Sequence, residues 1–466
     1  MEIHIWNTLS GKLELFKSIK PNEVGLYDCG PTVYDYAHVG NIRAYVFADI
    51  LRRTLEYAGY TVNQVINITD VGQLTGDGDD GDDKMTKALK REGKPLTLPA
   101  MKEVADFYAN AFLEDLALLN IKKANTYPKA SEHIAEDIEI LKKLEKNGFL
   151  YKTGDGLYFD TAKFPAYGKL GNINLKGLQS GARVKANAEK RNYTDFNLWK
   201  FNEIGWESPW GKGFPGWHIE CSAMSVKYLG QPFDIHTGAI DLIPTHHNNE
   251  IAQSESADGK PLCNYWMHNA FLNVSTGEKM AKSSGEFFKI QQLIDKGISP
   301  LAYRYWLLGA HYRTPIIFSW EALVGAQIAL MKLINEFLAF ENTDSLPDEN
   351  CIKQFESFIG DDLNTPKVVA LMWDLLKDKS VSESVKKATI LEFDKVLGLD
   401  LVKLSERIRN VLAEELPEHI SVLADLREKA RIEKDWQKAD AFRIELESLG
   451  YTVKDTPTGQ KVTKKL

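Results

Sequence analysis

The feature that most constrains the fold is a strand–helix–strand pattern near the N-terminus. The stretch VGLYDCG (24–30) is a short apolar run, residues 41–60 carry apolar side chains at helical spacing, and TVNQVINIT (61–69) is rich in β-branched residues. A unit of this length joins two parallel strands through a right-handed helical crossover. The pattern therefore predicts an α/β fold built on a parallel sheet.

Chemistry-bearing residues follow the first predicted strand. Cys29 stands near its end, and the turn HVGN (38–41) opens the helix. Ligands of parallel sheets gather at the carboxyl ends of the strands. A helix N-terminus favours phosphate, Gly40 lets a nucleotide approach the backbone, and His38 and Asn41 add donors. A helix cap with an ordinary hydrogen-bonded histidine is the alternative interpretation of this turn.

The sheet pattern returns after a long interruption. Helical patterns occupy 98–120 and 131–148, and the turn-rich stretch 151–205 contains only short strand-like pieces. Strand patterns reappear in PFDIHTGAIDLIP (232–244) and WMHNAFLNV (266–274). The turn-rich stretch therefore indicates an insertion between two halves of one sheet domain.

The stretch DVGQLTGDGDDGDD, residues 70–83, is rich in Gly and Asp and has no periodicity, which predicts an exposed loop. A calcium-binding loop is an alternative. Gly81 stands where that motif requires an oxygen ligand, which argues against calcium.

The character of the chain changes at about Ser319. Amphipathic helical patterns such as SWEALVGAQIALMKLINEFLAF and TPKVVALMWDLLKDK follow one another to about Leu416. Two further helical patterns lie within 420–450, and a Lys-rich tail ends the chain. A helical bundle and a small C-terminal unit are therefore expected after the sheet domain.

Composition restricts the class of protein. A length of 466 residues with 44% hydrophobic and 26% charged residues predicts about three globular domains. No signal peptide or apolar run of membrane length is evident. Four widely separated cysteines argue against a disulfide framework and for the reducing cytoplasm. The net charge of −8 does not favour nucleic-acid binding, although a local basic patch can supply it.

A second phosphate-binding candidate is GEKMAKSSG, residues 277–285. Lys279 and Lys282 lie three apart between glycines, and such a loop can neutralise the charge that develops on a leaving pyrophosphate. An ordinary solvated loop is the alternative, because most Lys-Ser-Gly stretches are of that kind.

A metal site is the third candidate. In PTHHNNEIAQSESA a helix is expected to begin near His246, which places His246 and Glu250 four apart on one face. With Cys29 and with Cys221 of GWHIECSAM they would form a mixed zinc site of two sulfurs, one nitrogen and one oxygen. Inert packing is the alternative for each cysteine, and sequence spacing alone does not bring the four together.

The C-terminal stretch KARIEKDWQKADAFR is the fourth candidate. The spacing puts Trp436 and Asp440 on one helix face with Arg431 near its edge. An exposed Trp beside Arg suits stacking on unpaired RNA bases, and Asp can accept from a base edge. A Trp packed into a small core is the alternative.

Together these motifs resemble a known family. HVGN after a first strand and KMAKS in a later loop resemble the two nucleotide-handling motifs of class I aminoacyl-tRNA synthetases. With CGPTVYDYAHVGN, WHIECSAM, HHNNEIAQSE and KDWQKAD, the chain resembles the cysteinyl-tRNA synthetases over nearly its whole length. The resemblance implies a Rossmann-type parallel-sheet catalytic domain (1–310) with a connective insertion at about 121–205, a tRNA-binding helical bundle (311–416) and an anticodon-recognition unit (417–466).

The resemblance also implies the activity and the residues that carry it. We expect a cysteine–tRNA ligase that forms cysteinyl-adenylate from L-cysteine and ATP and then charges tRNA(Cys), as a cytoplasmic monomer with no membrane partner. One zinc ion per chain would select the cysteine thiolate, and Mg²⁺ would accompany ATP. The assigned residues are the zinc ligands Cys29, Cys221, His246 and Glu250; the ATP-binding residues His38, Gly40, Asn41, Lys279 and Lys282, all but Gly40 catalytic; Thr69, Trp217 and Asp241 for cysteine and its adenylate; and Arg431, Trp436 and Asp440 for the anticodon.

The sequence departs from the family pattern at three places. Asn41 stands where histidine is usual and keeps a donor, and Ala281 stands where serine is usual. Ala239 and Ile240 occupy part of a run that is often Gly-rich, which affects the expected adenosine packing.

Two other functions stay open on sequence grounds. One is a related ligase that joins cysteine to an amino sugar, and residues 420–466 argue against it because such enzymes lack the anticodon unit. The other is a non-catalytic, zinc-containing RNA-binding protein, and the two lysines of 279–282 argue against that.

Overall fold

The computed structural model describes residues 1–71, 84–173, 189–274, 288–340, 345–413, 416–456 and 459–464. The chain forms two compact units, one of Met1–Leu330 with Asp344–Leu399 and the other of Met331–Thr343 with Asp400–Leu466. Each unit is described separately below. The domain boundaries expected from the sequence stay predictions.

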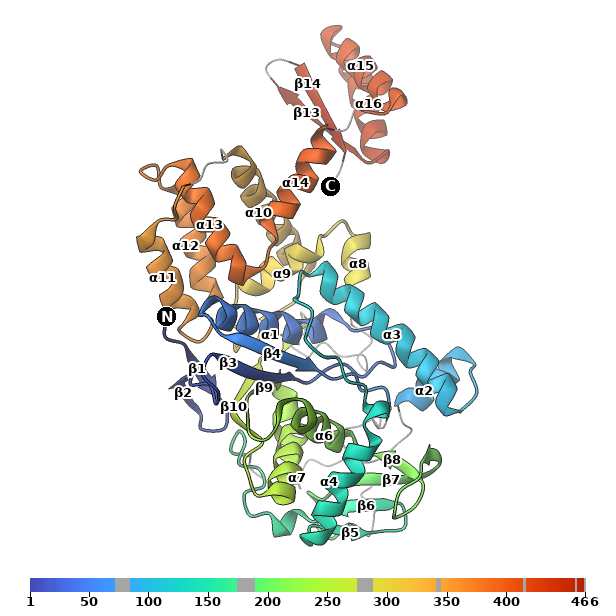
Figure 1. Ribbon diagram of the computed structural model, residues 1–466. Helices are drawn as coiled ribbons and strands as arrows, with labels where there is room; N and C mark the ends of the chain where they lie inside the picture. The colour runs from blue at the N-terminus through green and yellow to red at the C-terminus, as the bar shows by residue number, and fades with distance from the viewer. Residues whose placement is uncertain are drawn as a thin grey trace. The chain divides into compact units, whose positions relative to one another are not determined.

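A four-stranded parallel sheet forms the centre of the first unit (Figure 1). Its strands are β3 (Glu23–Asp28), β4 (Thr61–Ile66), β9 (Phe233–Ala239) and β10 (Cys263–Asn269), in the order β10-β9-β3-β4. The predicted α/β class and the parallel sheet are confirmed. Strands buried on both faces need near-continuous apolar runs, as in the middle of β3.

The order of the strands creates a switch point between β3 and β9. From β3 the chain crosses through α1 (Val39–Tyr57) to β4 on one side, and from β9 it crosses through α7 (Asn248–Asp258) to β10 on the other. Connections that leave in opposite directions open a crevice at the carboxyl ends of the two central strands, where α/β proteins bind their ligands.

A short N-terminal hairpin extends one edge of this sheet. Strands β1 (His4–Asn7) and β2 (Lys12–Leu15) pair antiparallel. The buried Asn7 side chain accepts from the Trp266 amide at 3.1 Å and donates to the Asn264 carbonyl at 3.0 Å. The hairpin is thereby bonded to β10.

The long stretch between β4 and β9 includes residues 121–205, where the sequence predicts an insertion. It contains α2 (Lys84–Glu92), α3 (Leu98–Leu118), α4 (Ile134–Lys146) and α6 (Trp217–Leu229), and a second sheet of β5 (Leu150–Lys152), β6 (Gly156–Phe159), β7 (Phe196–Trp206) and β8 (Gly213–Pro215). This sheet is antiparallel in the order β5-β6-β7-β8. Helix α4 packs on α6 and α7 over a shared apolar core, so the insertion supports the helices that flank the crevice.

Helices follow the central sheet. After β11 (Leu272–Asn273), which pairs in parallel with β12 (Ile316–Ile317), the helices are α8 (Ile290–Asp295), α9 (Pro300–Leu308), α10 (Trp320–Ala339), α11 (Glu349–Ile359), α12 (Thr365–Lys377) and α13 (Glu383–Leu397). Among the described helices, α10 alone has the length and composition to cross a membrane, an exception to the sequence prediction. This is weak evidence, because a core helix of a soluble protein meets the same criterion.

The second unit has its own small core. Helices α14 (Leu401–Ala413), α15 (Glu418–Ile432) and α16 (Trp436–Ser448) precede a hairpin of β13 (Tyr451–Thr456) and β14 (Gly459–Lys464). Ile420 and Leu446 pack with Tyr451 and Val453. The sequence predicts only a Lys-rich tail after the two helices, whereas the described part of that tail forms a hairpin. Alternating Tyr451 and Val453 supply the inward face of β13.

Helix α1 is held by a buried cluster of charges. Arg53 and Arg304 donate to the Asp49 carboxylate at 2.7 and 2.6 Å, and all three side chains are buried. Arg304 also donates to the carbonyls of Leu397 and Leu119. Burial raises the pKa of Asp49, but the two guanidinium groups outweigh it and hold that pKa below its usual range.

Replacing Asp49 is therefore expected to destabilise the fold. Asp49→Asn leaves two buried guanidinium groups without their anion, which should lower the free energy of unfolding by about 3–5 kcal/mol. Urea unfolding measures this. Glu139→Gln removes an exposed ion pair with Lys142 and should cost less than about 1 kcal/mol. Equal effects of the two substitutions would contradict the role given to the cluster.

Candidate active site and metal centre

Cys29 lies at the switch point because β3 pairs with β9. Its amide donates to the Thr237 carbonyl at 3.2 Å, and Asp28 just before it bridges three strands. The Asp28 carboxylate accepts from Thr237 of β9 and from Gln64 of β4. Burial raises the pKa of Asp28 to about 6 even though these two hydrogen bonds lower it. The end of β3 is thus fixed on both sides immediately before the cysteine.

Gly30 permits this close approach. A side chain at Gly30 would place its Cβ 1.5 Å from the Asn67 carbonyl oxygen, so only glycine fits there. The Gly30 amide donates to the Asn67 side chain at 2.8 Å. The ends of β3 and β4 therefore meet directly beside the cysteine.

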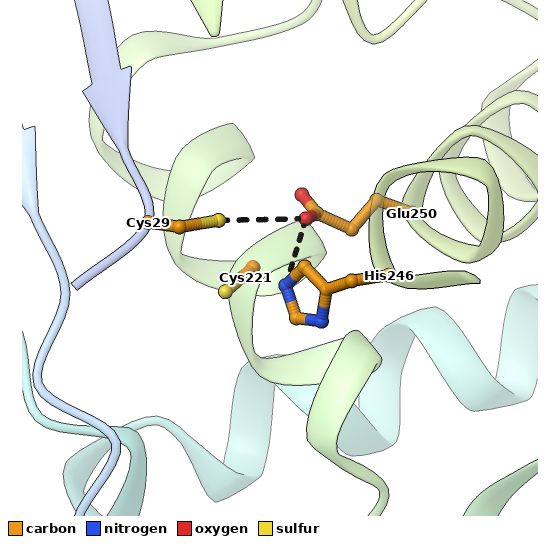
Figure 2. A group of neighbouring side chains, drawn as sticks. All are labelled: Cys29, Cys221, His246 and Glu250. Carbon is orange, nitrogen blue, oxygen red and sulfur yellow. Dashed lines mark hydrogen bonds and ion pairs between the residues drawn. The ribbon is translucent and has the colours of Figure 1, made fainter. Parts of the chain in front are cut away.

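Three other elements bring the predicted partners of Cys29 to it (Figure 2). Cys221 comes from α6, His246 from a π-helical turn (Ile243–His247), and Glu250 from the first turn of α7. One donor atom from each of the four side chains lies within 4.8 Å of the others. Figure 2 shows Glu250 between Cys29 and His246, with its Oε1 3.0 Å from His246 Nε2 and 3.9 Å from Cys29 Sγ. The structure thus brings together the four residues that the sequence analysis selected, although α7 begins at Asn248 rather than near His246.

The electrostatics of the group favour the charged forms of Glu250, His246 and Cys221 and the neutral thiol of Cys29. Burial opposes the charge of Glu250, but the imidazoles of His236 and His246 outweigh it and lower the pKa of Glu250 to about 2. Burial likewise opposes the charge of His246, and the Cys221 and Glu250 anions raise its pKa to about 10. A hydrogen bond with Cys29 lowers the pKa of the Cys221 thiol to about 6, and burial raises the pKa of Cys29. Buried groups of this kind are characteristic of functional sites.

A second, overlapping set of donors surrounds the first. Cys29, Glu250, His236 and His247 also offer four atoms within 4.8 Å of one another. His236 Nε2 lies 2.8 Å from Glu250 Oε2, and His247 Nε2 lies 3.3 Å from Cys29 Sγ. Neither histidine was predicted from the sequence. His236 could have been found from its place within the predicted strand 232–244, and His247 from its neighbour His246.

Trp217 and Thr69 lie close to this group, and Asp241 lies on the surface. The Trp217 ring packs against the His246 ring with centroids 4.4 Å apart. Thr69 is buried, its carbonyl accepts from the Val33 amide, and its hydroxyl accepts from Asn67. Asp241 is exposed in the short turn Ile240–Leu242 after β9. Their predicted contacts with cysteine or its adenylate stay predictions.

The HVGN turn caps α1. His38 Nδ1 accepts from the Asn41 amide at 3.1 Å, and the Asn41 side chain accepts from the His38 amide at 3.4 Å, which makes a reciprocal capping box. His38 is buried, whereas Gly40 is half-buried and Asn41 is exposed. The prediction that this turn caps a helix is confirmed. Nucleotide binding by the same turn stays a prediction, and it is compatible with the cap.

The second nucleotide candidate lies outside the described residues. Lys279, Ala281 and Lys282 fall in 275–287, and the acidic loop falls mostly in 72–83, so the structure tests neither prediction. The residue after the first of these segments is described: the Phe288 carbonyl accepts from the Val39 amide of α1 at 2.7 Å.

The three predicted anticodon residues lie on two helices rather than one. Arg431 belongs to α15 and pairs with Glu428 and Asp455, whereas Trp436 begins α16 and Asp440 follows on it. Lys434 between them has φ of 60°, which breaks the helix. Trp436 is 62% exposed, so its ring is available and the alternative of a core Trp is wrong.

Comparison with known proteins decides the family. A family model described as tRNA synthetases class I (C) catalytic domain matches residues 15–328, and one described as cysteinyl-tRNA ligase anticodon binding domain matches 413–462. A cysteine–tRNA ligase of Burkholderia lata is 46% identical over 99% of this chain and 97% of that protein, and one of Treponema denticola is 43% identical over the whole of both.

The chain belongs to the cysteine–tRNA ligase family. The resemblance drawn from the sequence is confirmed, as is the class I synthetase character of the enzyme. A solved Mycobacterium tuberculosis methionyl-tRNA synthetase in complex with methionyl-adenylate matches 84% of this chain and 94% of its own, with a TM-score of 0.56 and 14% identity. At that identity the likeness shows a shared fold only.

Proposed function

We propose that the protein attaches cysteine to tRNA(Cys) through a cysteinyl-adenylate, and that a zinc ion held by Cys29, Cys221, His246 and Glu250 selects the amino acid. The observation that carries the proposal is the convergence of these four side chains at the switch point of a family member. Cys29, Cys221 and the His246–Glu250 pair come from three parts of the chain far apart in sequence, so their meeting is not a product of local spacing.

The donor chemistry fits zinc. Two thiols, one imidazole and one carboxylate are ligands that zinc accepts, and two sulfurs exclude the hard cations calcium and magnesium. The alternative set with His236 and His247 offers one sulfur only. Because zinc favours sulfur ligands more than the harder cations do, we assign the two-sulfur set.

A zinc ion would explain how cysteine is distinguished from serine and alanine. When bound, the zinc would accept the soft thiolate of the substrate, a contact that a hydroxyl or a methyl group does not replace. A pocket that only distinguishes near-isosteres gains about 1–3 kcal/mol, whereas a site that requires one strong contact rejects substrates lacking it much more strongly. The Trp217 ring, which packs on His246, would close the pocket beside the metal group.

The remaining residues would position ATP. The N-terminus of α1 offers a positive dipole for phosphate, with His38, Gly40 and Asn41 around it. The cysteine carboxylate would attack the α-phosphate and release pyrophosphate, and a ribose hydroxyl of the terminal tRNA adenosine would then take the cysteinyl group. No protein nucleophile is required. Lys279, Lys282 and Mg²⁺ would offset the charge on the phosphates, while Thr69 and Asp241 would contact the cysteine or its adenylate.

Two observations disfavour the alternatives. A ligase acting on an amino sugar has no use for the anticodon-binding domain matched over 413–462. A non-catalytic, zinc-containing RNA-binding protein has no use for the catalytic domain matched over 15–328. We also infer a cytoplasmic protein, because the four cysteines are free thiols and a reducing compartment keeps them so. The monomeric state implied by the family resemblance stays a prediction.

Cysteine-dependent ATP–pyrophosphate exchange tests the proposal. The zinc-loaded protein should exchange with cysteine and not with serine, and chelation should abolish the exchange with cysteine. Cys221→Ser should act like chelation, because it removes one of two sulfurs, whereas Cys263→Ser removes a buried thiol outside the group and should keep the exchange. Exchange that survives full chelation, or that proceeds equally with serine, would refute the role of zinc.

Trp436 offers a separate test of tRNA recognition. Trp436→Ala should raise the KM for tRNA(Cys) by the equivalent of about 1–3 kcal/mol, the value of stacking one base, and should leave ATP–pyrophosphate exchange unchanged. Val422→Ala, at a 52% exposed position of α15, is the control for loss of an exposed apolar side chain. An unchanged KM for tRNA in Trp436→Ala would remove Trp436 from the anticodon interface.

A further inference from the structure

A chain of hydrogen bonds leads away from Cys29 through two histidines to the N-terminal segment. Cys29 Sγ lies 3.3 Å from His247 Nε2, His247 Nδ1 lies 2.8 Å from His268 Nε2, and His268 Nδ1 lies 2.8 Å from the Thr8 hydroxyl. Both rings are buried, at 0% and 3% exposure. The series of hydrogen bonds is continuous, so the position of the hydrogen on each group determines whether the next group donates or accepts.

Thr8 is held in place by the backbone around it. Its amide donates to the Trp266 carbonyl of β10 at 2.8 Å, next to the two bonds that Asn7 makes to the same strand. Thr8 precedes the stretch 15–328 matched by the catalytic-domain family model. The N-terminal hairpin therefore delivers a fixed hydroxyl to the interior of the catalytic unit.

The His247 ring is also fixed. It packs against both the His236 and the Trp266 rings, with centroids 4.6 and 5.0 Å away. Gly238 makes room for it, because a Cβ there would lie 2.6 Å from His247 Cε1 and 3.0 Å from His247 Nε2. A side chain at position 238 would therefore clash with the His247 imidazole, which contacts Cys29.

A thiolate ligand determines which group donates in each of these hydrogen bonds. A metal-bound sulfur carries no hydrogen and only accepts, so His247 must carry its hydrogen on Nε2. In a neutral ring, which burial favours, Nδ1 then accepts from His268 Nε2–H. His268 Nδ1 in turn accepts, and the Thr8 hydroxyl donates to it. One hydroxyl therefore sets the tautomers of two histidines.

We propose that Thr8, His268 and His247 form a positioning relay that donates one N–H to the Cys29 thiolate and holds it as a zinc ligand. The proposal rests on the zinc site of the proposed function. Partners beyond the ligands commonly orient them and tune their affinity for the metal. None of the three residues contacts the substrate in this role, so they are positioning residues.

Thr8→Val and Thr8→Ser in the full-length protein separate the relay from simple packing. Valine keeps the shape and loses the donor, so zinc affinity measured by competition with a chelator should fall about tenfold, the low end of the range for such partners. Serine keeps the donor and should bind zinc as the unsubstituted protein does. Equal zinc affinity of the two variants, at equal melting temperatures, would overturn the relay.

Histidine tautomers give a second readout that packing alone does not move. In ¹⁵N-labelled, zinc-loaded protein without substitutions, both His247 and His268 should carry hydrogen on Nε2, assigned with the help of His268→Gln. A His247 Nε2 without hydrogen would mean that this atom is itself a ligand, and would overturn the proposal even if Thr8→Val failed to fold. Absence of zinc binding by the unsubstituted protein would instead refute the zinc site of the proposed function, and the relay with it.

Discussion

The pairing of β3 with β9 is the interaction on which the rest of the site depends. These two parallel strands carry Cys29 and lead to α7, and their register sets Tyr27 beside His236 and Asp28 beside Thr237. A slip of one residue would turn every side chain of a strand to the opposite face. The Asp28 carboxylate, bonded to both neighbouring strands, opposes such a slip one residue before the cysteine.

The site concentrates polar and ionisable groups where the fold can least solvate them. Cys221, His246, Glu250 and His236 are all buried, and each is compensated by its neighbours rather than by water. Burial without compensation costs several kcal/mol for each charge, so such a cluster is a poor way to gain stability. Binding of a cation by this cluster would complete its charge balance and would explain why the fold contains it.

The sequence allowed some of this to be predicted and not the rest. The βαβ unit, the insertion and the four ligand candidates follow from periodicity, from motif spacing and from the family resemblance. Cys221 could not be joined to Cys29 by spacing, because the two residues belong to elements far apart in the chain, α6 and the end of β3. Thr8, His268 and His247 gave no motif, since they are related by two hydrogen bonds between the N-terminal turn, β10 and a helical turn. The hairpin of 451–464 was missed because its charged residues obscured a two-residue alternation of inward side chains.

X-ray absorption at the zinc edge tests the central claim most directly, because it counts sulfur neighbours without relying on catalysis. The account predicts two sulfurs in the substrate-free protein, three after addition of cysteine, and two after addition of serine. One sulfur in the substrate-free protein would favour the His236–His247 set over the assigned one. A sulfur count that cysteine does not change would contradict selection of the substrate through its thiolate.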